Sequence, residues 1–348
     1  MLTERVQRNW VEAFIEVFSL CGVEAGETAA VLSESQSRSV NVQLSELALA
    51  ELGAQPVHIV VPTPPASAPV PVRSTGASSA IAGSEVVIAA LSACTIIADC
   101  TVEGLLHASE LPAILKSGAR VLMVSDEHPE TLERLIPRID IQPKVAAGVK
   151  LMKDASEMRV TSDAGTDLTV DMQRAFAAGG CGWTTRTGDI SHWPGGLCAA
   201  FPRAGCVNGT IVMDKGDMNL TFKRYVETPI TLTIENDYVV DITGDGLDAE
   251  LFESYMAAWD DRDAYATSHV GWGMNPQARW DAFNLYDKSQ TNGTEQRVFA
   301  GNFLYSTGAN PSAGRHTLGH FDLPMRNCTI ALDGHLAVER GVLQGDLA

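Results

Sequence analysis

The chain has 348 residues, which is long enough for two domains with separate hydrophobic cores. Hydrophobic residues make up 45% of the sequence and charged residues 20%, a balance that indicates a folded chain and argues against long disordered tails. The formal net charge of −18 disfavours nucleic acid and anionic membranes as partners, because both are negatively charged.

The sequence predicts a cytoplasmic protein. Residues 1–6 contain no apolar signal core, and no apolar run approaches the roughly 18–20 residues of a membrane span. The seven cysteines are scattered and form no Cys-x-x-Cys pair, which argues against a disulfide framework and against a zinc ribbon. Reduced thiols in a reducing compartment are the simplest interpretation.

The first part of the chain alternates between predicted helices and predicted strands. Apolar residues at spacings of three and four over residues 4–20 predict an amphipathic helix that ends at Gly22. Further helices and strands then alternate, at residues 42–49, 58–62, 84–92, 95–99, 110–116, 120–124 and from Pro129 onward. We therefore expect an α/β domain over residues 1–155, with a parallel sheet whose ligands lie beyond the carboxyl ends of the strands. No Gly-x-Gly-x-x-Gly motif follows its first predicted strand, so we predict no dinucleotide site.

The pattern changes to short β runs separated by Gly, Asn and Asp turns after about residue 155. Residues 158–162 and 166–170 predict two strands joined by an Asp-Ala-Gly turn, and one helix interrupts near residues 247–260. We expect residues 156–348 to form an α+β domain that is rich in antiparallel sheet and carries a metal site.

A His-x-Asp pair near the end of the chain is the first candidate for metal binding. If residues 319–324 are extended, His320 and Asp322 point to the same face, with Cβ atoms roughly 6–7 Å apart. Together with a distant second histidine, such a pair is typical of the facial triad that holds non-haem Fe(II). Taken alone, the pair is better interpreted as a histidine and an aspartate that flank a turn, so the rest of the chain has to decide.

Five histidines lie in the second part of the chain, and three of them have glycine-rich neighbourhoods. These three are His192, His269 and His320. Glycines beside a histidine let the backbone approach a ligand closely. We interpret His335, after Asp333-Gly334, as a solvated turn residue, and we leave His316 open as either a loop residue or a neighbour of the metal ligands.

Residues 191–341 resemble the aminopeptidase T type of metallo-aminopeptidase. The resemblance is carried by Trp193-Pro194-Gly195-Gly196, Asn208-Gly209-Thr210-Ile211, residues 268–276 and His320-Phe321-Asp322.

Two metal-binding glutamates of that family are replaced here, by Leu197 and His269. Without them there is too little negative charge for two dications. The remaining set of His269, His320 and Asp322 suits one Fe(II) ion.

The altered pattern resembles the 2,5-dihydroxypyridine 5,6-dioxygenase family, and the likeness extends to Gly104-Leu105-Leu106-His107. The resemblance implies a mononuclear Fe(II) dioxygenase of extradiol type. Its reaction would convert 2,5-dihydroxypyridine and O₂ to N-formylmaleamate in nicotinate degradation. The resemblance also implies a serine at the iron, which we assign to Ser306, with the adjacent Thr307 as the alternative.

The expected substrate contacts come from both parts of the chain. His107, in a predicted connection after a strand, is expected to take a hydroxyl proton from the substrate; a packed loop histidine is the alternative. Leu106, His192 and Trp193 are expected to contact the substrate, with the imidazole of His192 donating to a substrate oxygen and the indole of Trp193 covering the ring. Core packing of Trp193 is the alternative.

The expected partners are this small substrate, O₂ and further copies of the chain, with a hexamer as one arrangement. The competing functions are a metallo-aminopeptidase and a scaffold without catalysis.

Overall fold

The computed structural model describes residues 5–65 and 77–348. Residues 1–4, part of the start considered above for a signal sequence, lie outside this description. Within the described residues, no helix has both the length and the apolar character needed to cross a membrane. All seven cysteines are described and unpaired, as expected.

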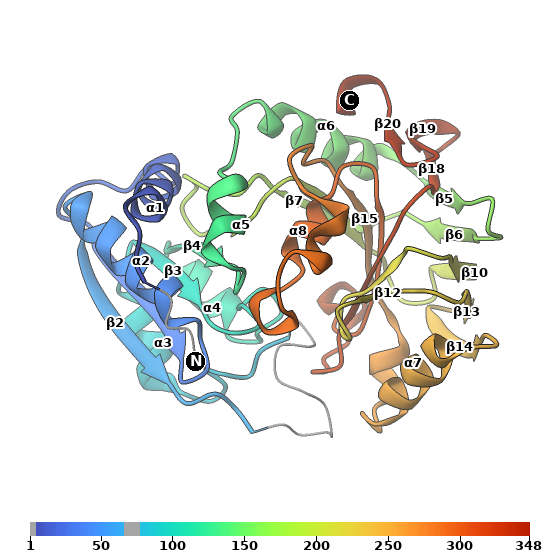
Figure 1. Ribbon diagram of the computed structural model, residues 1–348, viewed down its shortest axis with the longest axis horizontal. Coiled ribbons are helices and arrows are strands. Elements are labelled where there is room, and N and C mark those ends of the chain that lie inside the picture. Colours follow the sequence, from blue (N-terminus) through green and yellow to red (C-terminus); the bar gives the residue numbers. More distant parts are fainter. Residues whose placement is uncertain (1–4, 66–76) are drawn as a thin grey trace.

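One half of the molecule, on the left of Figure 1, is built on a five-stranded parallel sheet. The spatial order is β2-β1-β3-β4-β8, and every neighbouring pair is parallel. The strands are β1 (Thr28–Glu34), β2 (Gln55–Val61), β3 (Ile96–Cys100), β4 (Arg120–Val124) and β8 (Ile190–Trp193). We call this half, with its helices, the parallel half.

Helices cover both faces of the parallel sheet. They are α1 (Arg8–Leu20), α2 (Ser39–Glu51), α3 (Glu85–Ser92), α4 (Leu111–Lys116) and α5 (Pro129–Arg134). α1, α2 and α5 share a hydrophobic core with one face, and α3 and α4 share a second core with the other. Residues of β1 alternate between these two cores, as a strand covered on both sides must. The predicted α/β architecture is confirmed, although the sequence analysis missed β1.

The other half, called here the antiparallel half, contains two large antiparallel sheets and a two-stranded ribbon. The eight-stranded sheet has the order β14-β13-β10-β6-β5-β18-β19-β20. Its strands are β5 (Glu157–Thr161), β6 (Asp167–Asp171), β10 (Val207–Met213), β13 (Ile230–Glu235), β14 (Tyr238–Thr243), β18 (Thr329–Leu332), β19 (His335–Glu339) and β20 (Val342–Leu343). The ribbon pairs β11 (Met218–Asn219) with β12 (Arg224–Tyr225).

The five-stranded antiparallel sheet has the order β17-β16-β15-β9-β7. Its strands are β7 (Phe176–Gly180), β9 (Leu197–Phe201), β15 (Thr267–Gly273), β16 (Phe303–Thr307) and β17 (Phe321–Met325). Side chains from both large sheets form one hydrophobic core. The predicted antiparallel character of this part of the chain is therefore confirmed.

Helical segments complete the antiparallel half. They are α6 (Ile141–Asp154), α7 (Leu247–Ala257), α8 (Thr294–Val298) and the 3₁₀ turns η1 (Arg262–Tyr265), η2 (Trp280–Asn284), η3 (Lys288–Gln290), η4 (Pro311–Ala313) and η5 (Gly345–Leu347).

The two halves exchange elements across residue 155. α6, which precedes this point, buries Ile141, Val145 and Met152 in the core of the antiparallel half. β8, which follows it, pairs with β4 as the last strand of the parallel sheet. The division into domains at residue 155 stays a prediction, and the packing of these two elements does not follow it.

Candidate metal centre

One face of the five-stranded antiparallel sheet carries polar side chains, because its strands alternate. Tyr305 and Phe321 point into the hydrophobic core, and their neighbours Ser306 and Asp322 point to the opposite face. Ser306 and Asp322 are also direct partners across β16 and β17. A hydroxyl and a carboxylate are thus brought together on one face of the sheet.

β15 adds His269 to the same face. The next residue, Val270, lies in the core, so alternation points the imidazole of His269 away from it. The pairing of β15 with β16 also shifts register between Thr267 and Val270, and such an irregularity re-aims nearby side chains. The Nε2 atom of His269 lies 3.6 Å from Oδ1 of Asp322.

His320 enters the site immediately before β17. Its Nε2 atom lies 3.4 Å from the same Oδ1 atom of Asp322, as the His-x-Asp spacing predicts. The preceding residue must be small, because a Cβ added at Gly319 would lie only 2.6 Å from the Cβ of Ala264. The glycine beside His320 therefore permits a close packing of the backbone, as expected.

His107 reaches the site from the parallel half, on the loop after β3. Asp99, near the end of β3, organises this loop through its buried carboxylate. The backbone N–H and hydroxyl of Thr101 donate to Oδ1 of Asp99 at 3.0 and 2.6 Å, and the backbone N–H of Leu105 donates to Oδ2 at 2.7 Å. This loop is fixed at the carboxyl end of the sheet, where ligands are expected.

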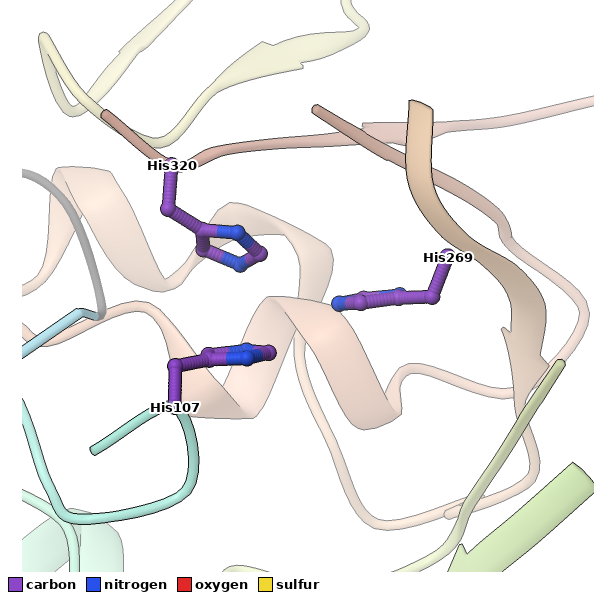
Figure 2. A group of neighbouring side chains, drawn as sticks. All are labelled: His107, His269 and His320. Atoms are coloured by element: carbon purple, nitrogen blue, oxygen red, sulfur yellow. The ribbon is translucent and has the colours of Figure 1, made fainter. Parts of the chain in front are cut away.

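The three histidines converge, as Figure 2 shows, with His107, His269 and His320 pointing toward one another from three segments. Each offers one ring nitrogen, and these nitrogens all lie within 4.8 Å of one another. The ring centroids of His107 and His320 are 4.4 Å apart. The sequence analysis placed His107 in the site but separated it from the metal ligands.

Burial sets the protonation states of this group. It lowers the pKa of His269 to about 3 and the pKa of His107 well below its ordinary value. Burial alone would raise the pKa of the Asp322 carboxyl, but Arg297 and His320 hold it well below its usual range. His107 and His269 thus offer neutral imidazoles and Asp322 an ionised carboxylate, the states in which these side chains bind metal ions.

Two further side chains hold the carboxylate of Asp322. The hydroxyl of Ser306 donates to Oδ1, and Nε of Arg297 donates to Oδ2 at 2.6 Å. Thr307 alternates to the other face, so Ser306 is the hydroxyl beside the carboxylate. The sequence analysis missed Arg297, because nothing in its short helix α8 marks it as a site residue. It also missed the role of Asp99, although an acidic residue near the end of a buried strand is a signal that could have identified it.

A cavity between the two halves joins these groups. Its walls include Leu106, His107 and His192 from one side, and His269, Arg297 and Asp322 from the other. Leu106 is exposed and His192 half-buried. The structure thus places Leu106 and His192 at the cavity, where a substrate contact is possible.

The hydrogen bond of His192 limits what its ring can do. Nδ1 lies 2.6 Å from the carbonyl oxygen of Pro194, which can only accept, so Nδ1 carries the proton. Burial lowers the pKa of His192. Nε2 of the neutral ring is therefore an acceptor, whereas the sequence analysis expected the imidazole to donate to a substrate oxygen.

Trp193 lies in the hydrophobic core and not in the cavity wall. Its side chain is fully buried, its Nε1–H donates to the carbonyl of Leu135 at 2.9 Å, and its ring packs edge-on against Phe14. The expected contact of Trp193 with the substrate ring is thus corrected to the core-packing alternative. The physical reason is the alternation of β8, which points His192 and Trp193 to opposite faces.

The two positions that the sequence analysis compared with metal-binding glutamates of the aminopeptidase T family both lie at the cavity. Leu197 begins β9 and lines the cavity with an aliphatic side chain, and His269 supplies a neutral nitrogen. In the described part of the chain, one group of His, Cys, Asp and Glu side chains meets the spacing of a metal site, namely the three histidines.

Comparisons with known proteins agree with both resemblances. A family model described as 2,5-dihydroxypyridine 5,6-dioxygenase matches residues 9–345. A curated protein of Pseudomonas putida (strain KT2440), named 2,5-dihydroxypyridine 5,6-dioxygenase, is 34% identical over 334 residues, covering 95% of this chain and 94% of that protein.

Solved structures show the same relationship. The structure of the 2,5-dihydroxypyridine dioxygenase from P. putida KT2440 has a TM-score of 0.92 and 33% identity, covering 98% of this chain and 99% of that one. Wild-type AmpT from Thermus thermophilus has a TM-score of 0.57 and 12% identity, covering 97% and 99%, which shows a similar fold alone.

Proposed function

The chain belongs to the 2,5-dihydroxypyridine 5,6-dioxygenase family, and we propose that it cleaves the ring of 2,5-dihydroxypyridine with O₂ and one Fe(II) ion. The product would be N-formylmaleamate, which contains both oxygen atoms of O₂, and the reaction would serve nicotinate degradation. The observation that carries the proposal is the convergence of two imidazoles and one carboxylate at a cavity between the halves.

The donor atoms fit one Fe(II) ion. Two ligands bound at right angles, each about 2.1 Å from an ion, lie about 3 Å apart. The distances of 3.6 and 3.4 Å from Oδ1 of Asp322 to Nε2 of His269 and His320 are close to this value. We therefore propose His269, His320 and Asp322 as ligands, joined by Ser306, whose hydroxyl lies against the same Oδ1 atom. When bound, Fe(II) would supply open positions at which a substrate oxygen and O₂ meet.

His107 is the proposed proton acceptor. His107 and Asp322 both line the cavity, but they come from different halves of the molecule. The loop that carries His107 belongs to the parallel half and is held in place by Asp99. Burial keeps the imidazole of His107 neutral, so one ring nitrogen is free to accept a hydroxyl proton from the substrate, although the same burial lowers its pKa and makes it a weaker base than a free imidazole. His192 can orient the substrate by accepting a hydrogen bond at Nε2, and Leu106 can contact the ring at the mouth of the cavity.

The other functions considered above gain no support from the site. The likeness to AmpT shows a similar fold and gives no information about activity. Leu197, an aliphatic residue, lines the cavity where the aminopeptidase resemblance would place a glutamate ligand. We also propose that the ring cleavage is of the extradiol type. Assembly into a homo-oligomer and a cytoplasmic location stay predictions.

The test is metal analysis of protein purified without air, combined with O₂ uptake. We expect one iron per chain and consumption of O₂ on addition of 2,5-dihydroxypyridine, with N-formylmaleamate as the product. Matched assays with 2-hydroxypyridine, which lacks the second hydroxyl, should show no uptake. Fully active protein that contains two zinc ions and no iron would contradict the proposal.

A further inference from the structure

The carboxylate of Glu127, in the parallel half, accepts hydrogen bonds from the start of helix α8. This helix lies between the two halves, in the middle of Figure 1. Glu127 follows β4 and is 1% exposed. Its Oε1 atom accepts from the backbone N–H groups of Gly293 and Thr294, both at 2.8 Å, and Oε2 accepts from that of Asn292 at 2.9 Å. The N–H groups of Gly293 and Thr294 are among those that a helix leaves without partners at its start.

No residue of the α8 segment itself supplies this cap. The residue before the helix is Gly293, at a φ of 101°, and it has no side chain to accept the free N–H groups. The negative charge of Glu127 also suits the positive end of the helix. The conformation of residues 292–295 therefore depends on a carboxylate that arrives from the loop after β4.

The same short segment reaches the proposed metal site. Nε of Arg297 donates to Oδ2 of Asp322 at 2.6 Å, and Nη1 donates to the side-chain oxygen of Asn292 at 3.3 Å. That oxygen also accepts from the hydroxyl of Thr294 at 2.8 Å. A chain of contacts therefore runs from Glu127 through residues 292–294 to Arg297 and the carboxylate of Asp322.

We propose that Glu127 is a positioning residue of the metal site. By holding residues 292–294 it fixes Arg297 against Asp322, and the parallel half thereby sets the metal affinity of a site whose ligands lie in the antiparallel half. Partners that orient a ligand contribute 10–100-fold to metal affinity or activity in comparable sites, as an order-of-magnitude guide. This inference rests on the proposed function, because it assumes a metal at Asp322.

The first experiment measures Fe(II) affinity of the full chain by anaerobic titration. Glu127→Ala should bind Fe(II) about 10–100-fold more weakly than the unmodified protein. Glu127→Gln should fall between the two, because its amide oxygen can still accept from part of the segment. Glu130→Ala is the matched control, since this neighbouring side chain is 58% exposed and should leave the affinity unchanged.

A double-variant cycle separates positioning from a general loss of stability. If Glu127 acts through Arg297, then Glu127→Ala should weaken Fe(II) binding little further in a chain that already carries Arg297→Gln. If the double variant instead loses Fe(II) affinity by the product of the two single-variant losses, the two residues act independently and the inference is overturned. Hydrogen exchange should show the amides of residues 292–294 released in Glu127→Ala. An unchanged Fe(II) affinity in this variant would also overturn the inference.

The outcome also distinguishes this inference from the proposed function. Unmodified protein that binds no Fe(II) would remove the proposed function and the inference with it. Unmodified protein that binds Fe(II), alongside a Glu127→Ala protein that binds it equally well, would remove the inference alone. If Glu127→Ala does not fold, Glu127→Gln supplies the same comparison with a smaller expected change.

Discussion

Ser306 and Asp322 lie directly opposite each other on β16 and β17, and the hydroxyl of Ser306 donates to Oδ1 of Asp322. That oxygen also faces Nε2 of His269 and of His320. One hydrogen bond across two strands therefore orients the carboxylate that completes the proposed ligand set. Thr307, the next residue, has a buried hydroxyl with no hydrogen-bond partner among the residues that the structure describes.

Ser306→Ala should weaken iron binding about 10–100-fold, because it removes a proposed ligand whose hydroxyl also orients the carboxylate of Asp322. The measurement is an anaerobic Fe(II) titration with iron content after dialysis. Thr307→Val is the matched control. It removes a neighbouring buried hydroxyl that makes no hydrogen bond to the described residues, so it should leave iron binding intact. Equal losses in both variants would show that Ser306 has no special place at the site.

His269→Ala, His320→Ala and Asp322→Ala should each abolish iron retention and turnover. Each removes one of the proposed histidine and carboxylate ligands, and the fold should persist, as circular dichroism can verify. His335→Ala should be nearly silent, because His335 is exposed at the start of β19, as the sequence predicts for a turn residue. Iron loss in His335→Ala together with normal iron in His269→Ala would show that the ligands are misassigned.

His107→Ala should keep its iron and lose about 10²–10⁴-fold in turnover, the usual contribution of a positioned base. The affinity for 2,5-dihydroxypyridine should fall much less. Iron content is decisive, because the nitrogens of the three histidines lie within 4.8 Å of one another, so a three-imidazole site is the competing arrangement. Loss of iron in His107→Ala would favour that arrangement, and near-normal turnover in His107→Asn would reject a role as base.

Trp193→Phe should lower the free energy of unfolding by about 1–3 kcal/mol, because it leaves the carbonyl of Leu135 without its donor. The KM for 2,5-dihydroxypyridine should stay unchanged, since Trp193 packs in the core away from the cavity. Denaturant unfolding and steady-state kinetics measure the two quantities. A raised KM with unchanged stability would instead place the indole at the substrate.

The sequence by itself determined the features that depend on neighbouring residues. Alternation of strands and helices predicted the parallel sheet, and short β runs predicted the antiparallel half. The His-x-Asp spacing predicted that His320 and Asp322 lie side by side on one face, because side chains of a strand alternate every two residues, and Nε2 of His320 lies 3.4 Å from Oδ1 of Asp322. The resemblance to the aminopeptidase T family, with Leu197 and His269 in place of two glutamates, predicted one metal ion held by two histidines and one carboxylate, and this ligand set stays a prediction.

Tertiary structure alone decided which distant segments meet. In the folded chain, the ring of His107 contacts that of His320. β8 pairs with β4 in the parallel sheet, and as a result Trp193 lies in the core while His192 lines the cavity. The tertiary structure also joins Glu127 to the start of α8. These contacts join segments that lie far apart in the sequence, so no local period encodes them. They follow from which faces must be buried when the two halves pack together.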